Sequence, residues 1–273
     1  MLLLLHDREM RRYDTVMTDH PAWTPTAGHW LARVMHSPDG SHALVRTDGT
    51  RAEWCCPLAA ACEPGVFALP EGAAPELAAP LGTLGPVARF ANPSLWDAIA
   101  TAVIRQVVRA DQARVQYRAL CEAHGTEVRC GDLAGRLLPS PETVLGLSDA
   151  GFKTLGLAFK RAALRAAAEA FLKDGAAWAF LPAGELAAVL PSVHRIGLWT
   201  AGAAAADWSN DFSLYPYGDM AVRTWAARAA PEVGWPGSEP GFRTRWEQAT
   251  SPHLADITLL TLAWGGHHAR TAA

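Results

Sequence analysis

The chain has 273 residues, half of them apolar, with 19% charged residues and a formal net charge of −3. This length and composition predict a folded protein of one or two domains with a sizeable core, and they exclude a disordered chain. The weak negative charge argues against binding of nucleic acid by overall electrostatic attraction, although a local basic patch remains compatible with it.

The sequence contains no recognisable targeting or membrane-spanning segment. The apolar run at residues 2–5 is too short for the core of a signal peptide, and no later run is long enough to cross a bilayer. The five cysteines include no repeated CxxC pair. We therefore expect free thiols, no structural metal and a cytoplasmic protein. The adjacent His267 and His268 are explained more simply as an exposed pair than as metal ligands.

Residues 1–88 are expected to form a small α+β domain. Residues 29–34 and 42–46 alternate as β-strands do, and the Ser-Pro-Asp-Gly stretch at 37–40 is typical of a tight turn between them. Residues 64–86 are rich in Pro, Gly and Ala. They predict one or two short helices between loops, or a crossing to the next domain.

Residues 89–273 are expected to form a compact and purely helical bundle, so the fold class is mostly α. Apolar spacing without Gly or Pro predicts one long helix over 95–121, or two in close succession, with Ser94 as the cap. Ser140 and Ser148 are expected to begin two further helices, and residues 159–173 an Ala-rich one.

The segment 185–228 carries the candidate chemistry. It predicts short helices over 185–190 and 198–208 joined by a Gly-bearing turn, then an apolar loop that ends at Asp219, then another helix. Such a hairpin leaves free backbone N–H groups at the start of its second helix, where the helix dipole also favours an anion. It can therefore hold a phosphate without net positive charge.

These residues resemble the helix-hairpin-helix Gly/Pro/Asp DNA glycosylases, in particular the bacterial 3-methyladenine DNA glycosylase II type. Residues 193–201 resemble the hairpin usually written LPGIGPWTA, and residues 215–223 resemble the loop FPAGDLGLR. Three further matches follow the family's order, namely Ile-x-Gln at 104–106, LGL-x-x-KR at 155–161 and a last helix at 259–264. The resemblance covers roughly Arg89 to Trp264 and implies a helical glycosylase core after a small α+β domain.

The resemblance implies a monofunctional N-glycosylase that flips an alkylated purine out of double-stranded DNA and leaves an abasic site. Asp219 matches the catalytic aspartate, whose carboxylate stabilises positive charge on the sugar and can take a proton from water. Trp199 and Trp264 match aromatic positions of the base pocket, where a π-face suits a cationic base. Because Trp199 also stands at the position of the catalytic lysine of bifunctional relatives, we expect no Schiff-base step.

The resemblance also implies contacts with the DNA backbone from one group of residues: Arg105, His194, Arg195, Ile196 and Gly197. Arg195 and Arg105 stand where the family has glycine, so each either adds a charge-assisted phosphate contact or blocks the site. We expect a monomer that needs no cofactor. A monovalent cation at the hairpin, as in relatives, stays open.

Local sequence alone also allows plainer roles. Asp219 precedes a helix and is compatible with an ordinary N-cap paired with Arg223, while Trp199 and Trp264 are compatible with core aromatics. Ala203 stands where close relatives have an aromatic pocket residue, which predicts a wider pocket.

Two other functions therefore remain open at this stage. One is a helix-hairpin-helix DNA-binding protein without turnover, motivated by Arg195 and Arg105. The other is a glycosylase specialised for a bulky adduct or a nucleoside, motivated by Ala203.

Overall fold

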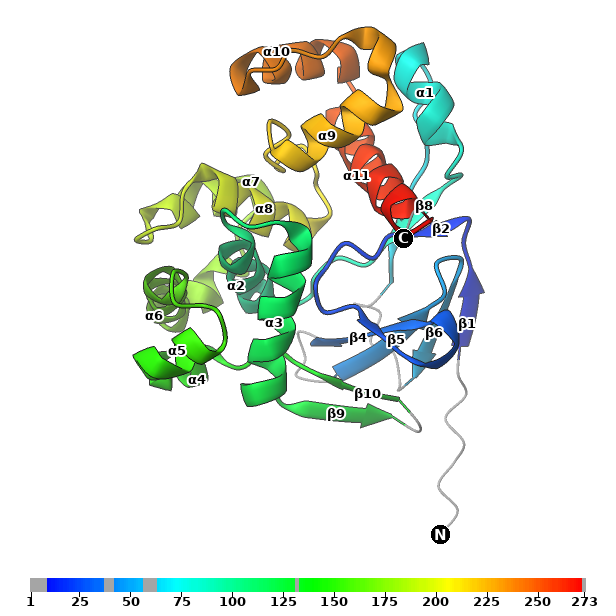
Figure 1. The fold of residues 1–273 in the computed structure, drawn as a ribbon. Coiled ribbons are helices and arrows are strands. Elements are labelled where there is room, and N and C mark those ends of the chain that lie inside the picture. Colours follow the sequence, from blue (N-terminus) through cyan, green and yellow to red (C-terminus); the bar gives the residue numbers. More distant parts are fainter. Residues whose placement is uncertain (1–8, 37–41, 56–62, 131–132, 272–273) are drawn as a thin grey trace.

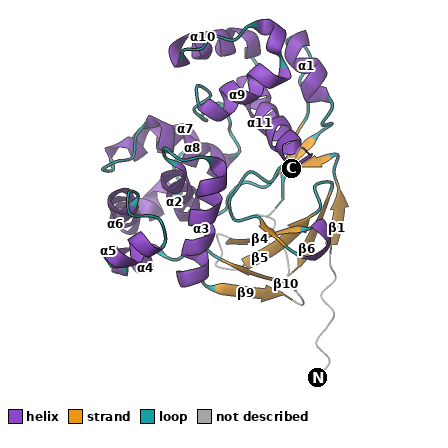
Figure 2. Ribbon diagram, viewed as in Figure 1, coloured by secondary structure: helices purple, strands orange, loops and turns teal. Residues whose placement is uncertain are grey.

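The computed structural model describes residues 9–36, 42–55, 63–130 and 133–271, so the turn expected at 37–40 lies outside the described residues. A helical core is joined to small sheets built mainly from the first ninety residues (Figures 1 and 2). This confirms the predicted fold class. No helix in the described ranges is both long and apolar enough to cross a membrane.

The helical core begins at the predicted cap, where Ser94 Oγ accepts the Asp97 N–H at 3.2 Å. Ser140 and Ser148 cap their helices in the same way. The region expected as one long helix or two is two helices. The helices are α1 (Pro75–Gly82), α2 (Leu95–Arg105), α3 (Ala110–His124), α4 (Pro141–Gly146), α5 (Asp149–Thr154), α6 (Arg161–Trp178), α7 (Ala183–Val189), α8 (Leu198–Ser209), α9 (Met220–Ala229), α10 (Glu239–Thr250) and α11 (Leu254–Thr271), with 3₁₀ turns at Ala27–His29, Leu190–Ser192 and Pro231–Val233.

Helix α2 lies at the centre of the core. Every residue from Leu95 to Ile104 is buried, and the helix packs against α3, α6 and α8. Only its last residue, Arg105, is half-exposed. Helix α2 is therefore buried on all sides, and its C-terminal end is the part that reaches the surface.

The larger sheet confirms the two predicted strands. It is antiparallel in the order β1 (Glu9–Arg12), β6 (Arg51–Cys55), β5 (His42–Thr47), β4 (Leu31–His36) and β3 (Thr24–Pro25). Val34 pairs with Leu44, and His36 with His42. On one face of the sheet, Trp54 of β6 packs in one apolar cluster with Trp23 and Phe90.

A smaller sheet forms within the first ninety residues. Strand β8 (Val87–Arg89) runs parallel to β2 (Thr15–Val16) and antiparallel to β7 (Gly65–Phe67). Helix α1 packs against α9 and α11, so part of the first 88 residues covers the C-terminal helices. The boundary between 88 and 89 stays a prediction.

The expectation that the chain is helical throughout after residue 95 is wrong at one place. A hairpin of β9 (Glu127–Cys130) and β10 (Leu133–Arg136) follows α3. It packs on β4 and β5 of the larger sheet, and Gly135 lies so close that a Cβ there would stand 2.4 Å from Val34 Cγ2. The two strands are short and carry charged residues, and the surface that buries their apolar side chains is distant in sequence.

Candidate active site

A cavity of about 880 Å³ opens where the C-terminal end of α2, the turn before α8 and the first turns of α9 meet. Asp219, Arg105, Arg195 and Trp199 line it. Four of the residues expected at the site are thus brought together from three separate stretches of the chain.

Asp219 occupies the N-cap position of α9, but its side chain makes no capping hydrogen bond. The backbone of Asp219 forms the turn, because its N–H donates to Pro216 O at 2.7 Å. Arg223, the other expected partner, donates to the carbonyl of Gly237. The Asp219 carboxylate therefore does not cap α9 and is not paired with Arg223, the two plainer roles that the local sequence allowed.

The carboxylate of Asp219 is positioned from behind by buried aromatic residues. Tyr215 Oη donates to Asp219 Oδ2 at 3.3 Å, and burial raises the pKa of this phenol, which keeps it a donor. The Tyr215 ring stacks on Phe212 at 5.6 Å. The loop that carries these residues sits tightly on α8, since a Cβ at Gly202 would lie 2.4 Å from Leu214 O. Asp219 is thus held by the phenol while its other oxygen remains available.

The turn before α8 is fixed to the end of α2 by one side chain. Gln106 Nε2 donates to Arg195 O at 3.1 Å and to Thr200 Oγ1 at 2.9 Å. Lys160 in turn donates to the Gln106 carbonyl. Three of the segments that carry the family resemblance, at 104–106, 155–161 and 193–201, therefore meet at this one residue.

Arg195 keeps the backbone conformation that glycine favours. Its φ is 65°, in the left-handed region, which costs a residue with a Cβ about 1–2 kcal/mol. The side chain is exposed and donates from Nε to His194 Nε2 at 3.2 Å. Gly197 is the N-cap of α8 and is exposed, whereas Ile196 is buried in the core. The side chains available at this surface are therefore those of His194 and Arg195.

Arg105 forms part of the cavity wall and carries a positive charge there. Burial disfavours the charged form, but the negative charges of Asp19, Asp207 and Asp219 outweigh it, so the pKa of Arg105 is raised above its usual value. The guanidinium is a permanent cation beside Asp219, and its position is that of a wall residue of the cavity.

The aromatic residues that line the cavity are in part different from those expected from the sequence. Trp199 lines the cavity as expected, and Trp225 of α9 lines it as well. Trp264 is half-buried outside this lining, where its ring stacks on His268 at 3.9 Å. Ala203 is 3% exposed within the core and is also outside the lining.

Several cavity residues were not predicted. Met220, Ala221, Thr224 and Trp225 share one face of α9 and follow Asp219 at helical spacing. The signal in the sequence was the four-residue spacing of Met220 with Thr224 and of Ala221 with Trp225, directly after Asp219.

Comparisons with known proteins bear on the fold. The sequence matches no protein-family model and no curated protein. The structure is similar to the 3-methyladenine DNA glycosylase of Archaeoglobus fulgidus, with a TM-score of 0.66 and 16% identity over 95% of this chain and 99% of that one. The chain has the fold of the helix-hairpin-helix DNA glycosylases.

Two structures determined with DNA share this glycosylase fold. The 8-oxoguanine glycosylase/lyase of Clostridium acetobutylicum, solved with double-stranded DNA, has a TM-score of 0.66 and 11% identity over 92% of this chain and 89% of that one. MBOgg1 in complex with a low-affinity DNA ligand has a TM-score of 0.68 and 10% identity over 99% of each chain.

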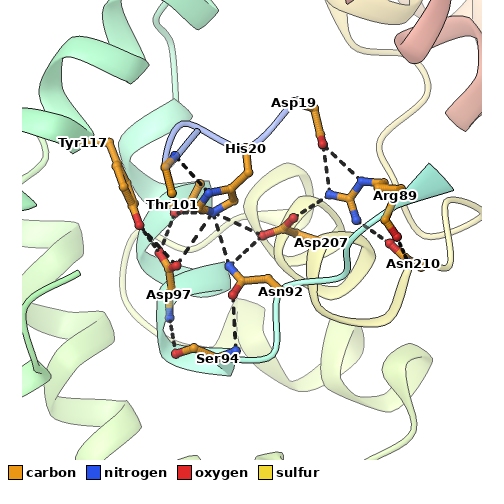
Figure 3. Close-up of polar contacts among 11 residues, drawn as sticks. Asp19, His20, Arg89, Asn92, Ser94, Asp97, Thr101, Tyr117, Asp207 and Asn210 are labelled. Carbon is orange, nitrogen blue, oxygen red and sulfur yellow. Dashed lines mark hydrogen bonds and ion pairs between the residues drawn. The ribbon is translucent and has the colours of Figure 1, made fainter. Parts of the chain in front are cut away.

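Apart from this cavity, a buried polar network joins the sheet region to the helices (Figure 3). Arg89 Nη2 donates to Asp207 Oδ1 at 2.6 Å and to Asp19 Oδ2 at 2.9 Å. Asn92 Nδ2 donates to Asp207 Oδ2 at 3.0 Å. Arg89 also lies over the Phe212 ring at 4.8 Å, which connects the network to the ring that stacks on Tyr215. Sequence reasoning missed this network, because its partners are far apart in the chain.

His20 is the neutral centre of the network. Its Nδ1 accepts the Ala22 N–H at 3.1 Å, which leaves the ring proton on Nε2, facing Thr101 Oγ1 at 3.2 Å and Asp207 Oδ2 at 3.6 Å. Burial lowers the pKa of His20 well below its usual value, and burial raises the pKa of neighbouring Asp97 to about 6.

Within the described ranges, no group of three or more His, Cys, Asp or Glu side chains could hold a metal ion. Cys121 and Cys130 are buried thiols. The side chains that line the cavity include one carboxylate, three guanidinium groups and aromatic rings.

Proposed function

We propose that this protein is a monofunctional DNA N-glycosylase that excises alkylated purines from double-stranded DNA and leaves an abasic site. The observation that carries the proposal is Asp219, whose carboxylate lines the cavity together with Trp199 and, among the described residues, accepts a side-chain hydrogen bond from Tyr215 alone. A carboxylate held in this way, next to an aromatic wall, suits a reaction that develops positive charge on a sugar.

The reaction follows from this placement. A base in a duplex cannot be reached, so the nucleotide turns out of the stack, and the base stacks on Trp199 in the cavity. As the glycosidic bond lengthens, the sugar acquires oxocarbenium character and the Asp219 carboxylate stabilises it. Water then adds to the sugar carbon while Asp219 accepts its proton.

An exposed valine is well placed to occupy the gap that the flipped base leaves. Val107 is fully exposed at the mouth of the cavity, and its φ of 53° is unusual for a β-branched residue. Apolar side chains inserted between base pairs are a common means of holding DNA distorted. The exposed Arg195 and the free N–H groups at the start of α8 suit the adjacent phosphates.

The proposed reaction ends at the abasic site. None of the residues that line the cavity is a lysine, and Lys160 donates to the Gln106 carbonyl, so no amine is placed to form a Schiff base. Hydrolysis at Asp219 needs no cofactor. A monovalent cation at the turn before α8, and action as a monomer, belong to the same proposal.

The test is release of free base from duplexes that each carry one damaged base, including 7-methylguanine and ethenoadenine, with abasic sites detected by alkaline cleavage. Wild type is compared with Asp219→Asn, and the melting temperature of both is measured. We expect release from at least one duplex, lowered about 10²–10³-fold or more in the variant.

Two other outcomes separate the alternatives. Salt-sensitive DNA binding with no abasic product from any duplex would identify a binding protein without turnover. Release that is equal in wild type and Asp219→Asn would contradict the assigned role of this carboxylate.

A further inference from the structure

We propose that Arg105 makes the cavity selective for uncharged damaged purines, such as ethenoadenine, over the cationic bases 3-methyladenine and 7-methylguanine. This inference rests on the proposed function, because it concerns the base held in the same cavity. Arg105 is the last residue of α2, and it lines the cavity together with Asp219 and Trp199. A permanent positive charge thus stands in the wall of the space offered to the base.

Nothing in the surrounding structure neutralises this charge by direct contact. Within the described part of the chain, the Arg105 guanidinium forms no hydrogen bond or ion pair. The carboxylates of Asp19 and Asp207 act on it from a distance, and both are already bound by Arg89. Its N–H donors therefore remain available to a base that presents acceptor atoms.

A cationic base meets two opposing effects in this cavity. The π-face of Trp199 attracts it, and the guanidinium repels it. In a partly buried site, the repulsion between two full charges near contact is larger than one cation–π attraction. A cationic base also leaves as a neutral molecule, so the guanidinium has no developing negative charge to stabilise.

For an uncharged base the same guanidinium assists the reaction. The glycosidic bond breaks, and its electron pair goes to the base nitrogen, so negative charge develops on the leaving base while positive charge develops on the sugar. Arg105 stabilises the first and Asp219 the second. Water adds its oxygen to the sugar carbon and gives one proton to Asp219, which then releases it to solvent, and the base anion takes up one proton from solvent. The net reaction consumes one water.

Arg105 is the member of this pair that sets specificity, because the positive charge on the sugar is the same for both classes of base. Arg105 stands at a position where the resemblance to the family predicts glycine, and the cavity provides the space for its longer side chain. The side chain fills the cavity wall and changes the charge that the base meets.

The experiment measures single-turnover excision of ethenoadenine and of 7-methylguanine from otherwise identical duplexes, at enzyme concentrations that saturate binding. Wild type, Arg105→Met and Arg105→Lys are compared. We expect wild type to favour ethenoadenine, and Arg105→Met to lower that rate by about 10²-fold while leaving or raising the 7-methylguanine rate. Arg105→Lys keeps the charge and should recover part of the preference.

Arg109→Met is the matched control, because this substitution also removes one positive charge from the lining of the same cavity. Its side chain is 85% exposed and pairs with Asp111 at 3.1 Å. Its loss should change both rates by the same factor and leave their ratio unaltered.

The outcomes separate this inference from the function on which it rests. A wild type that prefers 7-methylguanine, or an Arg105→Met variant that lowers both rates equally, overturns the role of Arg105 and leaves the glycosylase proposal standing. If Arg105→Met does not fold, the wild-type ratio alone decides. No Asp219-dependent release from either duplex overturns both.

Discussion

The two ends of helix α8 treat carboxylates in opposite ways. At its C-terminal end, Asp207 is buried and bound by Arg89 and Asn92, with Asp19 completing the network. At its N-terminal end, Trp199 and Thr200 line a cavity in which Asp219 has a single phenol partner. The same chemical group is saturated with partners where it supports the fold, and it is left with an available oxygen where it faces the cavity. The number of partners, more than burial alone, separates the two roles.

The largest effect is expected from breaking the network. Arg89→Met leaves Asp19 and Asp207 buried without their cation, which should lower the free energy of unfolding by about 3–5 kcal/mol. Urea unfolding followed by tryptophan fluorescence measures it. Arg109→Met, which breaks only an exposed pair with Asp111, should stay within about 0.5 kcal/mol of wild type. Equal effects of the two variants would mean that the buried network contributes no more to stability than the exposed ion pair does.

At the cavity end, Trp199→Ala should weaken the binding of lesion-containing DNA by about 1–3 kcal/mol, the usual contribution of stacking one base on an aromatic ring. The Kd for an undamaged duplex should change little, because its bases stay stacked. Fluorescence anisotropy with both duplexes gives the comparison. A uniform loss for both would place Trp199 on the DNA backbone and outside the base pocket.

The network should also give the protein a pH-dependent stability, through His20 and Asp97. Burial holds the pKa of His20 below its unfolded value of about 6.5, so its contribution is present above that pH and is lost as the pH falls through the folded pKa. Asp97 has the opposite sign, because its folded pKa of about 6 lies above its unfolded value and its contribution fades as the pH rises from about 4 to 6.

The His20 contribution is isolated by comparing variants. The melting temperature of wild type minus that of His20→Asn should fall as the pH is lowered from 7.5 towards 5, roughly the range below the free histidine pKa. A difference that is constant with pH would mean that folding leaves the pKa of His20 unchanged, and a difference that rises would mean that His20 is charged in the folded state.

The smallest effect is expected at the turn before α8. Arg195→Gly removes the cost of the left-handed backbone and should stabilise the protein by about 1 kcal/mol. It should also reduce the slope of log K against log salt for DNA binding by about 1, if the side chain contacts one phosphate. An unchanged slope together with higher stability would leave Arg195 without a DNA contact.

The sequence predicted the cavity end better than the network end, for a physical reason. The turn before α8, Asp219 and Trp199 all lie within one stretch, so spacing and family resemblance could locate them. Trp225 could have been found from the four-residue spacing that places it one turn beyond Ala221 on the same face of α9. Ser94 was predictable because capping is local.

What could not be predicted depends on contacts between distant residues. Arg89 and Asp207 are 118 residues apart, and neither position has a local pattern that indicates a partner. The β9–β10 hairpin was missed for the same cause, because its apolar residues are buried by β4 and β5. The position of Trp264 outside the cavity follows from how α11 packs on α9, which no sequence motif records.

The central claim, that the cavity beside Asp219 receives a nucleotide turned out of duplex DNA, is tested most directly by a crystal structure of Asp219→Asn bound to a duplex containing ethenoadenine. We expect the damaged nucleotide in the cavity, with its base against Trp199, its sugar carbon facing position 219 and the Val107 side chain in the vacated stack. A duplex whose damaged base stays stacked, or one bound on another face of the protein, would contradict the account.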